Sequence, residues 1–136
     1  MSVEIYGDSS NPRAIVIRSS HKAESIEFLT PLDYSLQVGV MSRPAGYAVA
    51  PHIHNQIVRT IEGTQEVLII RNGECEINLF NIANEIDATI SVFENDVILL
   101  AHGGHGITMK TDCEILEVKQ GPYVQVSDKR FISEEK

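Results

Sequence analysis

The sequence has no tryptophan, few aromatic residues and a shortage of cations. Lysine and arginine number 11 against 19 aspartates and glutamates, so the 136-residue chain has a formal net charge of −8. Non-specific binding to nucleic acid or to anionic membranes depends on clustered cations. The charge balance therefore argues against both as partners. It does not exclude a small anionic ligand, which a few local cations can hold.

Cysteine and long apolar runs are also scarce. Cys75 and Cys113 lie in alternating apolar and polar segments. We expect them to be reduced thiols packed in the core, and a disulfide between them is possible but not implied. The N-terminus lacks the basic and apolar regions of a signal peptide, and no apolar run reaches the roughly 18 residues of a membrane span. We therefore expect a cytoplasmic protein.

Almost every segment of the chain has the residue pattern of a short strand, and turn residues separate these segments. This pattern predicts an all-β fold, either an antiparallel sandwich or a barrel. No segment is a convincing helix, although residues 55–62 fit either a turn or two of helix or an extended loop. We expect one domain over residues 1–136, with a barrel core at about 34–121 and a polar tail at 127–136. The expected strands are 14–18, 24–29, 34–42, 46–50, 64–71, 74–80, 88–93, 97–100, 104–109 and 113–119.

The strongest local signal is the pair Asn72-Gly73 between two apolar segments. Asn-Gly tolerates the positive φ angles of a tight turn, so we predict a two-residue hairpin there. The preceding strand, at 64–71, is apolar on both faces. We expect it to be covered on both sides, by a second sheet, a loop or a partner subunit.

Four of the five histidines form two tight groups. His52 and His54 are two residues apart, so on an extended backbone both point to one face. Two neutral imidazoles side by side are half of a transition-metal site. His102 and His105 form the second group, in a glycine-rich stretch between two expected strands.

Together these groups resemble the motifs of the cupin superfamily of small β-barrels. Gly46, His52-x-His54 and Glu66-x6-Gly73 match the first cupin motif, and Asp96 and His105 occupy the two ends of the second. The resemblance covers about residues 36–121. It implies a cupin fold, which is a jelly-roll or double-stranded β-helix barrel.

The resemblance also implies a metal held by His52, His54, Glu66 and His105. Three imidazoles and one carboxylate suit a divalent transition metal such as Zn, Fe, Mn, Ni or Co. The spacer of 11 residues between His54 and Glu66 is longer than is usual in the family, and Glu62 is a competing candidate for the carboxylate. His102 stands where the family has the glycine of Pro-x-Gly. It is a fifth ligand, a catalytic general base or a loop histidine.

Two segments near the C-terminus, 117–123 and 128–131, resemble single-domain cupins found among bacterial surface-polysaccharide genes, whose usual labels are sugar isomerase or epimerase. Residues 36–39, 43–44 and 64–66 share this resemblance. This resemblance suggests a sugar or nucleotide sugar as the ligand. Our leading hypothesis is a metal-dependent enzyme that moves a proton on such a ligand, with His102 as the candidate catalytic base because imidazole titrates near neutral pH. The alternatives are an iron-dependent dioxygenase, a non-catalytic binding or sensing module, and a barrel that has lost its function. Arg59 and Arg43 are the first candidates for binding an anionic substrate, followed by Arg71 and Lys119.

Small barrels of this family commonly pair through edge strands. The apolar strand at residues 14–18 would be an aggregation hazard at a sheet edge unless something covers it. We therefore expect a two-fold homodimer.

Overall fold

The structure is a computed structural model that describes residues 1–125 and 128–132. No α-helix occurs within those residues, so the prediction of an all-β chain is confirmed. The strands at 97–100 and 104–109 have the predicted bounds, while β1 was not predicted and no strand forms at 46–50. The ten strands are β1 (Val3–Asp8), β2 (Asn11–Ile17), β3 (Ile26–Phe28), β4 (Gly39–Met41), β5 (Glu66–Asn72), β6 (Cys75–Phe80), β7 (Ile86–Val92), β8 (Val97–Leu100), β9 (Gly104–Met109) and β10 (Glu114–Lys119).

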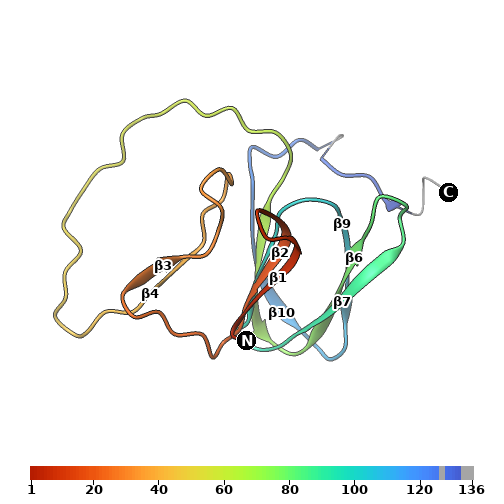
Figure 1. Cartoon of the computed structure of the whole chain (residues 1–136), viewed down its shortest axis with the longest axis horizontal. Coiled ribbons are helices and arrows are strands. Elements are labelled where there is room, and N and C mark those ends of the chain that lie inside the picture. The colour runs from red at the N-terminus through yellow and green to blue at the C-terminus, as the bar shows by residue number, and fades with distance from the viewer. Residues whose placement is uncertain (126–127, 133–136) are drawn as a thin grey trace.

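The strands form two antiparallel sheets and a separate hairpin, arranged in three layers (Figure 1). The large sheet has the order β1-β2-β8-β5-β10, and the small sheet has the order β7-β6-β9. The hairpin β3-β4 lies on the other side of the large sheet from the small one (Figure 1). The N-terminal strands are thus part of the large sheet, although they precede the predicted barrel core.

Successive side chains of a strand point to opposite faces, so the apolar residues of the large sheet form one cluster on each of its faces. The cluster between the two sheets includes Leu68 and Ile70 of β5 and Ile77 of β6. The cluster on the outer face includes Val67 and Ile69 of the same β5, packed under the segment that carries the hairpin. The prediction that this strand is covered on both faces is confirmed.

Arg13 within β2 and Arg18 directly after β2 join the two sheets on one side of the sandwich. Arg13 makes a bidentate ion pair with Asp87 of β7, at 2.8 and 2.9 Å. Arg18 donates to the backbone carbonyl of Ser91 at 2.7 Å and pairs with Glu4 of β1. These contacts tie the large sheet to β7 along this side.

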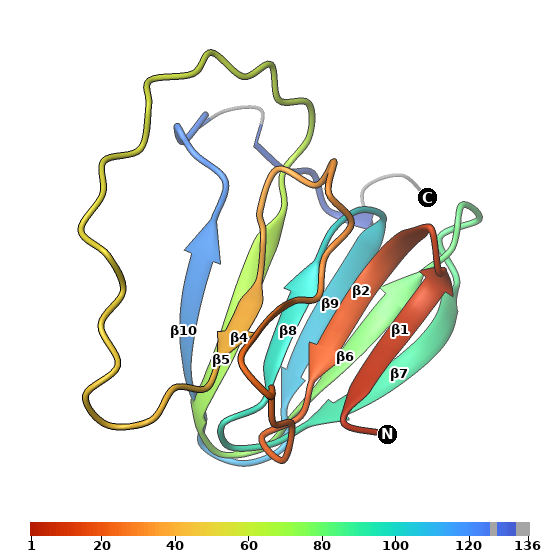
Figure 2. The same ribbon diagram turned by 60° about the vertical axis from the view of Figure 1, so that its left-hand side comes forward.

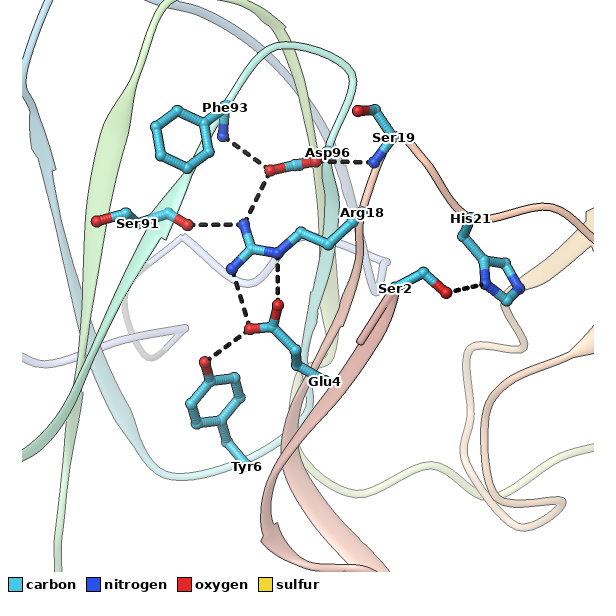
Figure 3. A network of polar contacts seen from close by, with 9 residues as sticks. All are labelled: Ser2, Glu4, Tyr6, Arg18, Ser19, His21, Ser91, Phe93 and Asp96. Atoms are coloured by element: carbon cyan, nitrogen blue, oxygen red, sulfur yellow. Dashed lines mark hydrogen bonds and ion pairs between the residues drawn. The ribbon is translucent and has the colours of Figure 1, made fainter.

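Asp96 is the second anion that contacts Arg18, and it is only 3% exposed (Figure 3). Its carboxylate accepts a hydrogen bond from Arg18 at 2.9 Å and from the backbone amides of Ser19 and Phe93 at 2.8 and 2.9 Å. The carboxylate therefore connects the end of β2 to the turn before β8. The acidic residue of the second cupin-like motif has a structural role here.

The opposite side of the sandwich is open. β9 and β10 are the edge strands of their sheets, and no backbone hydrogen bond joins them in the part of the chain that the structure describes. Near this side, residues 42–64 form a long excursion without strands or helices, which we call the arm (Figure 2). Every residue of the arm is exposed. Of the two readings of residues 55–62, the structure shows the extended loop.

The predicted hairpin at Asn72-Gly73 is wrong, although the turn itself exists. β5 pairs with β8 and β10, whereas β6 pairs with β7 and β9, so the two strands lie in different sheets. Gly73 has a φ of 89°, as a tight turn requires. The signal identified the turn but not the change of sheet, because the pairing of β6 with β7 and β9 depends on strands that lie farther along the chain.

We predict that Gly73→Ala lowers the free energy of unfolding by about 2 kcal/mol or more. A Cβ at this position would collide with the backbone oxygen of Asp112 and lie 2.8 Å from Cys113 Sγ. The matched control is Gly46→Ala, at a φ of +87° with nothing within 4 Å, which should cost only the backbone strain of about 1 kcal/mol. Urea denaturation measures both, and equal losses would contradict the close approach.

The expectation of an exposed edge at residues 14–18 is also corrected. β2 is flanked by β1 and β8, so β1 provides the cover, and the edges of the large sheet are β1 and β10. Both cysteines are free, with Cys75 buried and Cys113 half-buried. Burial raises the pKa of the Cys75 thiol to about 11. Among the described residues, no helix has the length and apolar character needed to cross a bilayer.

Candidate functional site

Glu66 and His105 meet at one end of the sandwich, across the gap between the two sheets. Glu66 is the first residue of β5 in the large sheet, and His105 is the second residue of β9 in the small sheet. Alternation turns both side chains inward, above the apolar core formed by Leu68 and Ile107. His105 Nε2 lies 2.6 Å from Glu66 Oε1. Residues that are 39 positions apart in sequence thus form a direct carboxylate–imidazole contact.

A second carboxylate lies beside this pair. Glu117 of β10 shares a hydrogen bond with Glu66, and this contact, together with burial, raises the pKa of Glu117. The hydrogen bond from His105 has the largest effect on the pKa of Glu66 and lowers it to about 2. The two neighbouring carboxyl groups therefore differ in proton affinity, with Glu66 ionised and Glu117 the better proton acceptor.

These three side chains line a cavity of about 950 Å³. Lys119 and Lys129 add positive charge to the lining, and Phe80, Phe131 and Ile132 add apolar surface. Lys119 Nζ is paired with Asp128 at 3.1 Å, and Lys129 lies over the ring of Phe131 at 5.5 Å. The predicted polar tail at 127–136 lies partly outside the described residues, but its portion 128–132 forms one wall of the cavity.

The structure brings together two of the four predicted metal ligands. The chemistry of Glu66 and His105 fits a divalent transition metal, since an ionised carboxylate and an imidazole are both good ligands for it. His52 and His54 lie on the exposed arm, with ring centroids 5.1 Å apart. Within residues 1–125 and 128–132, no group of three or more His, Cys, Asp and Glu side chains is placed to hold an ion. A single chain thus presents the four ligands as two separate pairs.

His102 and the candidate anion-binding arginines lie outside the large cavity. His102 Nε2 is 3.1 Å from the backbone carbonyl of Asn11. Arg43 bonds to Ser25 and stacks on Tyr47 at 4.4 Å, while Arg71 pairs with Glu114 at 3.1 Å. Arg59 lines a smaller pocket of about 380 Å³ beside Thr64. Of the four candidate cations, only Lys119 lines the large cavity.

Sequence reasoning missed Glu117 and the 128–132 wall. A signal for Glu117 was present in the sequence. Alternate residues of a strand share one face, and the inward face near the end of this strand consists of Ile115, Glu117 and Lys119. Polar residues on an otherwise apolar inward face indicate a site. The wall at 128–132 had no local signal, since it reaches the cavity only through the path of the chain after β10.

Comparison with known proteins gave no match to a family model, to a curated protein or to a solved structure. The functional argument therefore depends on the fold and the side chains themselves.

Proposed function

We propose that the cavity is the site of a metal-assisted enzyme of the cupin type, which moves a proton on a sugar or nucleotide sugar. The observation that supports this most directly is the contact of Glu66 and His105 within the cavity, at 2.6 Å. A carboxylate and an imidazole from two different sheets are held where a ligand can reach them. Ligand sites of β-barrels lie in a comparable place, at the mouth of the barrel.

Glu66 and His105 are the residues that would hold the ion from the sandwich, with His52 and His54 as the remaining ligands. A bound divalent ion polarises a carbonyl or hydroxyl oxygen of the ligand. The direct contact between Glu66 and His105 keeps the carboxylate ionised and fixes the orientation of the imidazole. A bound cation would take the place of the proton in this contact, because Nε2 of His105 and the Glu66 carboxylate would become its ligands.

Glu117 is the residue that we assign to proton transfer. It lines the cavity next to Glu66, whereas His102 is directed to the Asn11 carbonyl. In an isomerisation or epimerisation, a base removes a proton from the carbon beside a carbonyl and the proton returns to a carbon of the same ligand. The reaction needs no oxidant or reductant, so a single positioned carboxylate is sufficient.

The lining of the cavity matches a carbohydrate that carries a negative group. Lys119 and Lys129 supply cations for a phosphate or carboxylate, and Phe80 and Phe131 supply apolar faces on which a sugar ring can stack. The volume of about 950 Å³ accommodates a ligand of nucleotide-sugar size.

The test is ligand binding followed by proton exchange. A panel of sugar phosphates, nucleotide sugars and neutral sugars is first screened by thermal shift with the metal-loaded protein. The ligand that binds is then incubated in D₂O, and incorporation of deuterium at carbon is followed by NMR. We expect Glu66→Gln and His105→Ala to weaken binding about tenfold or more, because each loses a contact to a charged group.

Glu117→Gln separates catalysis from binding. We expect this variant to bind the ligand but to incorporate no deuterium, since an amide cannot accept the proton. The matched control is Glu76→Gln, because Glu76 lies on β6 between the buried Cys75 and Ile77 and so faces outward. If no member of the panel binds, the proposal fails. If a ligand binds without exchange in the wild type, the site is a binding site only.

A further inference from the structure

We propose that the arm of one chain crosses to a second copy and adds a strand beside β9, so that its two histidines complete the partner's Glu66–His105 site. This inference rests on the proposed function for the role of the histidines. The exchange of the arm itself is argued from the fold alone, and it can be tested without a ligand.

The arm has apolar side chains that its own chain does not cover. Ile53 and Val58 are 92% and 95% exposed, and Tyr47, Val49 and Ile57 are each more than half exposed. Connections longer than about 15 residues without secondary structure are uncommon in compact domains. A concentration of exposed apolar residues on such a segment marks a surface that binds another molecule.

The sandwich has a vacant position for a strand of this kind. β9 pairs with β6 along one edge only, and β10 pairs with β5 along one edge only. An unpaired edge presents backbone N–H and C=O groups that can accept another strand. Ile107 of β9 and Ile115 of β10 remain only half-buried at this open side, although both pack against the core.

The arm also has the alternation of a strand with one polar and one apolar face. In an extended backbone His52 and His54 share one face with the small residues Ala48 and Ala50. Tyr47, Val49 and Ile53 occupy the opposite face. A strand added beside β9 with its histidine face inward would bring both imidazoles to the side of the sandwich where His105 lies.

A second copy is the partner that fits this arrangement. The hairpin before the arm is fixed to the outer face of the large sheet by Val38 and Val40, and the arm runs outward from there, away from its own sandwich (Figures 1 and 2). Both ends of the arm are held in their own chain, so its outward reach is about half of its extended length of roughly 75 Å, which is still enough to reach a neighbouring molecule. A reciprocal exchange gives a closed two-fold dimer in which each site uses both chains.

The first experiment measures the oligomeric state by sedimentation at low micromolar concentration. We expect a dimer for the wild type and a monomer when residues 47–60 are replaced by a short Gly-Ser linker. The double variant Ala48→Asp with Ala50→Asp should also dissociate, because both residues lie on the histidine face that would turn inward, and it retains the full chain length. The control is Leu32→Asp, at a residue that is 94% exposed but lies outside the arm, and it should stay dimeric. A monomeric wild type overturns the exchange, and so does a dimer that persists in both arm variants.

The second experiment tests which chain supplies the histidines, with Co²⁺ as the probe. A chain carrying His52→Ala and His54→Ala is combined with a chain carrying His105→Ala, and the heterodimer is isolated through two different tags. Arm exchange leaves one intact site in this heterodimer, so we expect one cobalt against two for the wild-type dimer. The control pairs His105→Ala with Glu66→Gln, which can form no intact site in any arrangement.

The outcomes separate the two proposals. If the wild-type dimer binds cobalt but the heterodimer binds none, the histidines act within their own chain and the exchange is wrong. If the wild type binds no cobalt, the metal site of the proposed function fails. In that case the sedimentation of the arm variants still decides whether the arm is exchanged.

Discussion

Replacing Asp96 with alanine is expected to lower the free energy of unfolding by about 3–5 kcal/mol. The Asp96 carboxylate is almost fully buried and accepts hydrogen bonds from Arg18 and from the backbone amides of Ser19 and Phe93. The substitution leaves these two amides without their acceptor, and it removes one anion from the Arg18 guanidinium. Each unsatisfied buried donor costs about 1–3 kcal/mol. Urea denaturation at neutral pH measures the total.

Two further variants make this prediction specific. Asp87→Ala removes the partner of Arg13, but Asp87 is 36% exposed in its side chain, so we expect a much smaller loss than at Asp96. Asp96→Asn keeps one oxygen acceptor and should fall between the wild type and Asp96→Ala. A similar loss at Asp87 and Asp96 would show that Asp96 has no special role in joining β2 to β8.

The sequence predicted the central strands better than the N-terminal ones. β8 and β9 alternate cleanly or are wholly apolar between turn residues, and their bounds were predicted to the residue. β1 was missed because Val3–Asp8 mixes apolar, charged and glycine residues, and because its partner β2 supplies much of its order. The pairing of the strands was harder to predict than their bounds. Asn72-Gly73 has the local chemistry of a hairpin, but the choice between β9 and β5 as the neighbour of β6 depends on contacts remote in the chain.

The candidate site could be predicted only in part for a similar reason. Glu66 and His105 were selected from motif spacing, and the structure places them in contact. The same spacing does not determine where His52 and His54 lie, because the stretch of the arm that carries them is fully exposed. Glu117 entered the site through the register of β10 on β5, which pairs Lys119 with Glu66. Register is a tertiary property, so a single sequence does not specify it.

Leu79→Ala is expected to lower the free energy of unfolding by about 3 kcal/mol and to weaken ligand binding as well. Leu79 of β6 is 2% exposed and lies directly opposite His105 in the pairing of β6 with β9. Because opposite residues of an antiparallel pair share a face, truncation leaves a cavity in the core next to the imidazole. His105 then loses packing that holds it against Glu66. Urea denaturation measures the first effect, and calorimetric titration with the ligand that the binding panel identifies measures the second.

The matched control for this prediction is Ile86→Ala, on the neighbouring strand β7. Ile86 is 54% exposed, so its truncation should cost less than about 1 kcal/mol and leave binding unchanged. A Leu79→Ala variant that loses stability but binds the ligand with wild-type affinity would show that β9 positions His105 without help from the core. Unchanged stability would contradict the assignment of Leu79 to the core, because a buried leucine cannot be shortened without losing apolar contacts.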